Sequence, residues 1–137
     1  MPIIEIRSVL TNEILEIRHQ VLWPEKSIEF VKVPEDENAS HFGLFVNDQL
    51  ASVISLFPDN ENMRFRKFAT IPEFQNKGLG SQLLKFVINY SQENYYKNIW
   101  CDARSNALRF YERFGFSKFS EPFFKEKIEY YKISKTL

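Results

Sequence analysis

Two periods of hydrophobic and polar residues run along this chain and predict its strands and helices. An alternation of period two, typical of a half-buried strand, is clearest in residues 3–7 and 63–70. Apolar residues three or four positions apart, typical of an amphipathic helix, recur in residues 11–22 and 79–94. Shorter segments predict strands at residues 41–46, 50–57, 98–102, 116–119 and 128–133, and a helix at 105–114. The pattern predicts an α/β fold with a mixed, largely antiparallel sheet and helices on its faces.

Capping and breaking residues define the ends of the two flanking helices. Thr11 and Ser105 each stand just before helical spacing begins, and both residue types are good N-caps. Pro24 ends the first helix, and Gly115 stands at the C′ position of the helix that Ser105 begins.

The connections between these elements carry turn residues. Residues 47–49 and 58–60 contain Asn and Asp and predict two tight turns. Residues 25–38 are the least regular part of the chain, and five acidic residues against two lysines give them a net charge of minus three. We expect a loop there, with a short helix around Glu29.

The order of strand, helix and strand between residues 63 and 102 predicts a central parallel pair. Residues 63–70 and 98–102 flank the long helix at 79–94, and such a crossover is right-handed. No internal repeat, low-complexity tract or linker is visible, so residues 1–137 are expected to form a single domain.

Composition excludes several classes of partner. Eighteen basic and eighteen acidic residues cancel, so no overall field attracts nucleic acid. The one cysteine, Cys101, excludes an intrachain disulfide and fits a reducing compartment. The sequence contains neither a membrane-spanning apolar run nor a signal-peptide core. We therefore expect a cytoplasmic protein that binds neither membrane nor nucleic acid.

Glycine is rare in the chain, yet two of its four glycines lie within three residues of each other, in the segment Gln75-Asn76-Lys77-Gly78-Leu79-Gly80. This segment opens the long helix. A helix N-terminus offers unpaired amide groups and partial positive charge, so a glycine-rich turn there can bind phosphate, and Lys77 adds a full charge. The segment lacks the Gly-Lys-Ser/Thr of a Walker A loop and the third glycine of a dinucleotide fingerprint.

Two motifs together resemble the GNAT superfamily of acetyl-coenzyme A-dependent N-acyltransferases. The first is Gln75-x-x-Gly78-x-Gly80, which has the family's Gln/Arg-x-x-Gly-x-Gly/Ala pattern. The second is the segment from Asn106 to Phe116, with Tyr111 and Gly115-Phe116 at the family's spacing. The resemblance covers about residues 61–119. It implies a GNAT-like fold with a splayed parallel strand pair, and transfer of an acetyl group from acetyl-CoA to a primary amine by direct attack.

The resemblance also implies roles for individual residues. Tyr111 matches the general acid that protonates the departing thiolate. A backbone N–H near Ala69 would polarise the thioester carbonyl. No metal is implied, and the family pattern is compatible with a homodimer. The residues matching cofactor-binding positions are Phe68, Ala69, Gln75, Asn76, Lys77, Gly78, Leu79, Gly80, Ser81 and Asn106.

The general base is not defined by either motif. An amine with a pKa of about 10.4 needs help to lose its proton near neutral pH. No glutamate lies in residues 63–70, so His41 is the first candidate, followed by Glu35 and Asp36, while Glu73 belongs to the loop.

Several of these residues also fit purely structural roles. Tyr111 could be a core aromatic residue, Asn106 a helix cap, and Cys101 a small core residue. Trp23 and Phe30 could line an acceptor pocket or belong to the core. His19, His41 and Cys101 share no ligand spacing, so no zinc site is expected.

The acceptor and two other function classes remain open. Residues 64–77 carry a net charge of plus three and residues 25–38 one of minus three, which favours a small cationic amine as acceptor. The alternatives are a coenzyme A-binding regulatory module without catalysis and a protein-interaction domain on the same fold.

Overall fold

The computed structural model describes all 137 residues and divides them into two compact units. The first unit consists of Met1–Phe57 and Arg66–Val87, and the second of Pro58–Phe65 and Ile88–Leu137. The strands form a mixed sheet with the order β1-β2-β3-β4-β5-β8-β6, and β7 pairs with β8. This is the predicted α/β class.

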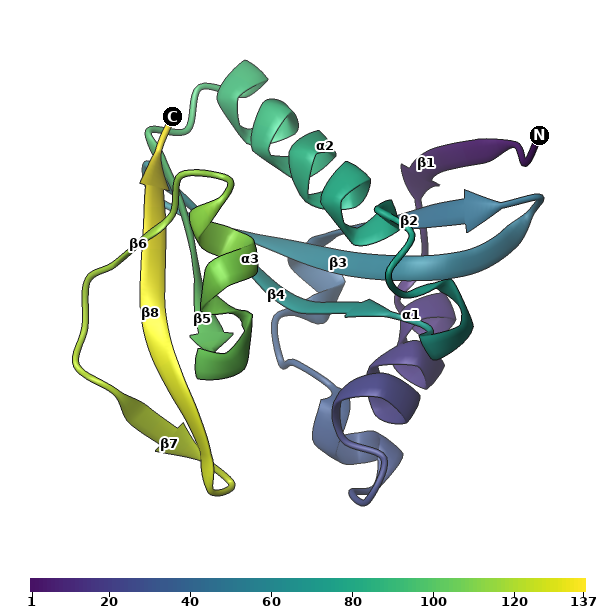
Figure 1. Cartoon of the computed structure of the whole chain (residues 1–137), viewed down its shortest axis with the longest axis horizontal. Helices are drawn as coiled ribbons and strands as arrows, with labels where there is room; N and C mark the ends of the chain where they lie inside the picture. Colours follow the sequence, from purple (N-terminus) through teal and green to yellow (C-terminus); the bar gives the residue numbers. More distant parts are fainter. The chain divides into compact units, whose positions relative to one another are not determined.

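The first unit begins with an antiparallel meander (Figure 1) of β1 (Ile4–Ser8), β2 (Ser40–Val46) and β3 (Gln49–Asp59). The last two residues of β3, Pro58 and Asp59, already belong to the second unit. The turn between β2 and β3 consists of Asn47 and Asp48, which both have positive φ, as a two-residue hairpin turn requires. This confirms the turn predicted at 47–49. β3 continues through Pro58 and Asp59, and its turn lies at Asn60-Glu61, so the turn predicted at 58–60 was placed too early.

Helix α1 (Thr11–Ile17) continues as a π-helical turn, Arg18–Leu22, so helical structure ends just before Trp23 and Pro24 as predicted. The predicted N-cap was wrong. Leu10 is the capping residue, and its N–H donates to the Glu13 carboxylate over 2.8 Å. Because the Glu13 side chain satisfies this amide, no hydroxyl is needed at the cap.

Helix α1 packs against the sheet through a hydrophobic cluster. Its Ile14 and Ile17 contact apolar residues of β2, β3 and β4, and this cluster forms the core of the first unit. Its buried members are Val9, Ile14, Ile17, Phe45, Val53 and Ala69. The segment after the helix contains 3₁₀ helices at Ile28–Val31 and Asp36–Asn38, the first of them at the place predicted around Glu29.

Strand β4 (Asn62–Thr70) is shared between the units, and residues 62–65 belong to the second. There it runs parallel to β5 (Asn98–Arg104), and the pairing covers Asn62–Arg64 against Asn98–Trp100. The parallel pair was predicted from the strand–helix–strand order. Its helix, α2 (Leu79–Glu93), has the predicted bounds to within one residue.

The rest of the second unit is built on β8 (Ile128–Thr136), the long yellow strand in Figure 1. It pairs antiparallel with β5, with β6 (Ser117–Lys118) and with β7 (Phe123–Lys125). The sequence did not predict β7. The turn between β7 and β8 is Glu126-Lys127, and both residues have positive φ although neither is Gly, Asn or Asp.

Helix α3 (Leu108–Glu112) is shorter than predicted, because Ser105–Ala107 form a separate 3₁₀ helix. Ser105 was predicted to be the cap, but Ala107 holds that position and the Ser105 hydroxyl donates to the Glu129 carbonyl. Gly115, with φ +93°, ends the helical segment as predicted, since the Gly115 and Phe116 amides bond back to Glu112 and Tyr111 in a Schellman motif. None of the helices is both long and apolar enough to span a membrane.

Candidate active site

The glycine-rich loop lies in the first unit and turns sharply before α2. Asn76 and Gly78 have φ values of +61° and +77°. A Cβ atom added at Gly78 would meet no heavy atom within 4 Å, so the backbone there is open. The first backbone hydrogen bond of the helix runs from Gln82 N–H to the Gly78 carbonyl. The amides of Leu79, Gly80 and Ser81 therefore precede the helical ladder, as in an anion-binding helix terminus.

Side chains fix this loop to the strand before it. The Gln75 side chain donates to the Thr70 carbonyl over 2.9 Å, and the Lys77 ammonium lies 5.8 Å from the centre of the Phe74 ring. Gly80 lies close to β4, because a Cβ there would come 3.5 Å from both the Phe68 ring and the Thr70 hydroxyl. The loop is anchored on β4, while its tip at Asn76, Lys77 and Gly78 is exposed.

Strand β4 is irregular just before the loop. Lys67 has φ +56°, a left-handed conformation that interrupts the alternation of the strand and bends it. Ala69 is buried, and its carbonyl accepts a hydrogen bond from the Ser52 hydroxyl over 3.2 Å. Phe68 and Ala69, both predicted as cofactor-binding residues, thus follow directly after this bend.

Tyr111 lies in the core of the second unit. Its ring packs against Phe65, Phe110 and Phe116 with centroid distances of 5.2–5.9 Å. The Cys101 thiol lies beside its hydroxyl. Burial raises the pKa of Tyr111 well above its usual value, and the neighbouring Cys101 adds to the shift. The phenol is therefore protonated throughout the physiological range and can only donate a proton.

Asn106 and Cys101 complete the predicted residues of this unit. Asn106 is exposed within the 3₁₀ helix Ser105–Ala107. Cys101 is buried in β5, and burial followed by the Asp102 charge raises the pKa of its thiol well above the usual value. A thiol in this state is unreactive, as its predicted core role requires.

A buried polar network that the sequence did not predict fills part of the first unit. The Arg18 guanidinium is fully buried and donates two hydrogen bonds of 2.8 Å to the Asp36 carboxylate. It also donates to the Val31 carbonyl and to the Ser55 hydroxyl. Burial alone would raise the pKa of Asp36, but the hydrogen bonds from Arg18 and the Val33 amide outweigh it and hold this pKa below its usual value. The Asp36 carboxylate is thus paired with the Arg18 guanidinium.

His41, the predicted base, belongs to the same network and is buried. Its Nε2 lies 2.8 Å from the Asp36 carbonyl, which can only accept, so Nε2 carries the proton. Its Nδ1 then accepts from the Ser55 hydroxyl over 2.7 Å, and Ser55 in turn accepts from Arg18. Both ring nitrogens are bonded inside the first unit, and the Thr11 hydroxyl lies 3.4 Å from Nε2.

The Arg18 position had a signal in the sequence. Arg18 interrupts the apolar stripe of the predicted helix at 11–22, and a charge on such a stripe is buried only when it is paired. Its partners could not be read from spacing, because Asp36 and Ser55 are 18 and 37 residues away.

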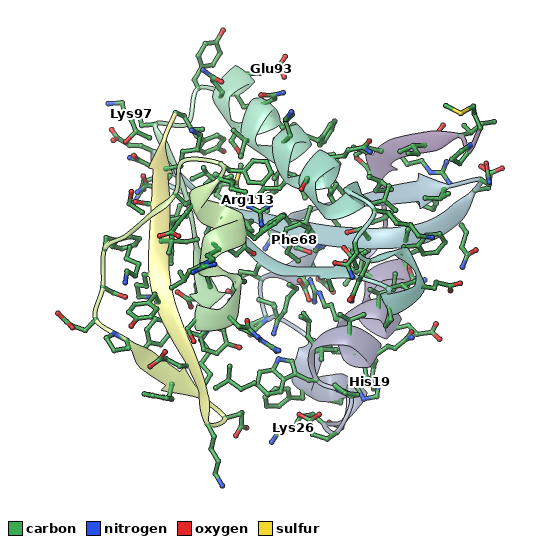
Figure 2. All side chains as sticks on the ribbon, viewed as in Figure 1. His19, Lys26, Phe68, Glu93, Lys97 and Arg113 are labelled. Atoms are coloured by element: carbon green, nitrogen blue, oxygen red, sulfur yellow. The ribbon has the colours of Figure 1, made fainter.

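The other residues named from the sequence lie in different surroundings. Glu35 and Glu73 are exposed. Trp23 is buried and packs edge-on against the partly exposed Phe30, with ring centroids 5.2 Å apart. The ring of His19 forms a hydrogen bond with the Lys26 carbonyl, and both residues are labelled in Figure 2. The structure contains no group of three His, Cys, Asp or Glu residues that could hold a metal ion.

Comparison with known proteins defines the family. The family model described as "Acetyltransferase (GNAT) domain" matches residues 12–137. The N-acetyltransferase YitI of Bacillus subtilis, named as uncharacterized, is 30% identical over an alignment of 129 residues, and the match covers 88% of this chain and 87% of that protein. The spermine/spermidine N(1)-acetyltransferase of Bacillus subtilis is 36% identical over an alignment of 106 residues, and the match covers 65% of this chain and 70% of that protein.

Solved structures have the same fold. A GNAT family acetyltransferase from Elizabethkingia anophelis with acetyl-CoA bound superposes with a TM-score of 0.76 at 20% identity, and the match covers 98% of each chain. The chain belongs to the GNAT acetyltransferase family, and its class is that of the N-acetyltransferases. The resemblance drawn from residues 75–80 and 106–116 is confirmed.

Proposed function

We propose that this protein transfers the acetyl group of acetyl-CoA to a primary amine of a small cationic molecule. The observation that carries the proposal is the open loop at Gly78, directly before the first hydrogen bond of α2. A structural relative in the same family holds acetyl-CoA, which supports this cosubstrate.

The loop would bind the pyrophosphate of coenzyme A. The amides of Leu79, Gly80 and Ser81 precede the helical ladder and can donate to phosphate oxygens, where the helix dipole also favours negative charge. The positive φ values of Asn76 and Gly78 turn the backbone on either side of Lys77, whose exposed ammonium adds charge. Gln75 would act indirectly by holding the loop to Thr70.

Strand β4 would hold the pantetheine arm. The parallel pairing of β4 with β5 covers only Asn62–Arg64, and we propose that the backbone further along β4, at Phe68 and Ala69, pairs with the amides of this arm. An N–H there would also polarise the thioester carbonyl. Asn106, in the second unit, is exposed, and we propose it as a further cofactor-binding residue on the strength of its motif.

Tyr111 would protonate the thiolate as it leaves. The raised pKa keeps the phenol protonated at all working pH values, which a general acid needs. A free phenol has a pKa of about 10 and a thiol one of about 8.5. Proton transfer from the phenol to the thiolate is therefore unfavourable by roughly 2 kcal/mol. The raised pKa of Tyr111 makes this transfer costlier, so the hydroxyl would have to donate a hydrogen bond directly to the leaving sulfur.

His41 is the residue we propose to receive the proton of the attacking amine. Its ring is buried and Nε2 already carries a proton, so the incoming proton would have to reach Nδ1. The Ser55 hydroxyl, 2.7 Å from Nδ1, would give its own proton to the ring and receive one from a bound water. Arg18 and Asp36 would then position the ring through Ser55 and the Asp36 carbonyl.

A small polyamine is the acceptor class we propose. Within residues 25–38, Glu29 pairs with Lys32 and Asp36 with Arg18. The side chains of Glu25, Glu35 and Glu37 form no ion pair and are exposed, so this segment presents unpaired negative charge. A relative that shares 36% identity is named for spermine and spermidine, which are cationic amines of this kind.

We also propose that the two units form one domain, because one family model spans residues 12–137 and β4 and α2 each run through both. The cytoplasmic location stays a prediction.

An acetyl-CoA consumption assay tests the proposed function. Spermidine, putrescine, lysine, glutamate and a neutral peptide are supplied separately as acceptors. We expect free coenzyme A to appear fastest with the polyamines. Turnover of anionic or neutral acceptors alone would refute the acceptor class, and failure of acetyl-CoA to bind in calorimetry would refute the cosubstrate.

A further inference from the structure

The second unit contains a cavity of about 400 Å³ that none of the proposed roles uses. Its lining combines two charged side chains, two carboxamides, a hydroxyl and two aromatic rings. These are Asp59, Asn62, Asn98, Trp100, Phe119, Lys132 and Ser134.

The cavity lies on the sheet face opposite to Tyr111. Along β5, Asn98 and Trp100 alternate with Ile99 and Cys101, and Cys101 lies beside Tyr111 on the other face. The register places Asn62 beside Asn98 and Ser134 beside Trp100, so these residues share one face. The cavity is therefore near the amino end of β5, whereas Asn106 and Tyr111 follow its carboxyl end.

Several polar groups of the lining are not used within the protein. The Asn98 side chain donates to the Asn62 side-chain oxygen over 3.1 Å, which leaves the Asn62 NH₂ group and the Asn98 oxygen available. The Asp59 carboxylate is exposed and forms no hydrogen bond or ion pair. A ligand here would meet the Asp59 carboxylate at one end, and the Asn62 NH₂ group and the Asn98 carbonyl oxygen in the middle.

The other end of the cavity is positive. Asp102 is nearly buried and accepts from three cations, Arg64, Lys125 and Lys132, at 2.8–2.9 Å. Three positive charges against one negative charge leave an excess of plus two. Of these cations only Lys132 lines the cavity, where its ammonium lies 5.0 Å from the centre of the Trp100 ring. This end favours an anionic group.

The distance between the two charged ends fixes the length of the ligand. Asp59 ends β3, and Lys132 places its ammonium over Trp100 of β5, two strands further along the sheet. The distance across two strand spacings is about 10 Å, and Trp100 also lies two residues along β5 from Asn98, the partner of Asn62. Since the ammonium and carboxylate of one amino acid are joined through a single carbon, they cannot span this distance. An extended peptide of three residues spans about 10 Å.

Aromatic rings supply the apolar part of the site. Trp100 and Phe119 meet edge to face with centroids 6.2 Å apart, and Phe119 is 55% exposed. An exposed phenylalanine beside a polar cavity can cover an apolar side chain of a ligand.

We propose that the second unit carries a binding site for short peptides of about three residues with free termini, distinct from the acetyl-transfer site. Asp59 binds the peptide ammonium and Lys132 the terminal carboxylate. The free carboxamide groups of Asn62 and Asn98 pair with the peptide bonds, and Phe119 and the edge of Trp100 contact the central side chain.

The test is a titration of the whole protein with glycyl-phenylalanyl-glycine, followed by the indole N–H signals of Trp23 and Trp100 in ¹H–¹⁵N spectra. Trp23→Phe and Trp100→Phe variants assign the two signals. We expect the Trp100 signal to move with a dissociation constant between about 10 µM and 1 mM, while the Trp23 signal stays. N-acetylation or C-terminal amidation of the peptide should each weaken binding roughly tenfold.

Asp59→Asn should weaken binding of the free peptide roughly tenfold and leave the N-acetylated peptide unaffected. Asp48→Asn is the matched control, because Asp48 is also an exposed turn-side aspartate and Asn tolerates its positive φ. The proposal is overturned if the Trp100 signal does not move at about 10 mM peptide, if capped peptides bind equally well, or if Asp59→Asn changes nothing.

Discussion

The hydroxyl of Tyr111 lies beside the thiol of Cys101, so the proposed general acid and the only cysteine of the chain are neighbours in the core of the second unit. Two roles of the tyrosine can be distinguished at this pair. One role is structural, in core packing, and the other is the donation of a proton to a leaving thiolate. Substitutions of either partner tell these roles apart.

Tyr111→Phe is expected to lower kcat by about 100-fold, which is typical for the loss of a general acid, and to leave the affinity for acetyl-CoA nearly unchanged. Steady-state kinetics and calorimetry measure the two quantities. Cys101→Ala is the matched control, because it removes the neighbouring thiol but keeps the phenol. Equal activity of the wild type and Tyr111→Phe would exclude Tyr111 from proton transfer.

The Cys101 thiol should make stability fall at alkaline pH. Its pKa is raised in the folded state, so above about pH 8.5 the unfolded chain loses this proton while the folded chain keeps it. The unfolded state then binds fewer protons, and the free energy of unfolding decreases by up to about 1.4 kcal/mol per pH unit. Below about pH 8.5 both states keep the proton and this loss is absent.

Urea denaturation of wild type and Cys101→Ala between pH 7 and pH 10 measures this contribution. The variant should show a flatter decline, until ionisation of tyrosines in the unfolded chain begins at about pH 10. Parallel curves for the two proteins would contradict the assignment.

Arg18→Met should destabilise the protein by about 3 kcal/mol or more, because it leaves the buried Asp36 carboxylate without its partner. Urea denaturation at neutral pH gives the value. Lys32→Ala breaks the exposed pair with Glu29 and should cost less than about 1 kcal/mol. Similar losses in both variants would mean that burial of the Arg18 pair has no energetic consequence.

Two glycines of the loop should differ in their tolerance to side chains. Gly80→Ala meets its neighbours at 3.5 Å, an ordinary contact, and should keep acetyl-CoA affinity within about threefold. Gly78→Val forces a β-branched residue into φ +77° at the proposed phosphate site and should abolish binding in calorimetry. Gly78→Asn is the control for the backbone, since Asn accepts positive φ. Unchanged affinity in a folded Gly78→Val variant would mean that the loop only begins the helix and does not bind phosphate.

The acidic segment should determine the KM for cationic acceptors. Glu35→Gln with Glu37→Gln removes two of its exposed charges, and we expect the KM for spermidine to rise roughly tenfold while kcat changes less. The double variant Glu93→Gln with Glu121→Gln removes two exposed charges elsewhere. If both double variants raise KM equally, only overall charge matters.

Local pattern was sufficient for most of the fold. The spacing of Leu79, Leu83 and Val87 predicted α2, and strand–helix–strand order predicted the parallel pair of β4 and β5. Gly115 ended its helix as predicted because only positive φ permits the Schellman motif there. Each of these features depends on residues that are neighbours along the chain.

The features that sequence reasoning missed depend on distant residues or on unusual turn chemistry. The β7–β8 turn at Glu126-Lys127 contains no Gly, Asn or Asp, so no turn residue predicted it. The bend at Lys67 is a left-handed residue inside a strand pattern that otherwise alternates. Arg18 looked like an interruption of an apolar stripe until Asp36 and Ser55 supplied its partners.

The burial of Cys101 has a practical consequence for experiments on this protein. Because its only native thiol is buried and its ionisation is suppressed, alkylating dyes should react with it slowly while the chain is folded. A cysteine introduced at an exposed position, such as Lys97, would then be the one fast-reacting thiol. Fluorophores or spin labels could be attached at chosen surface positions without first replacing the native cysteine.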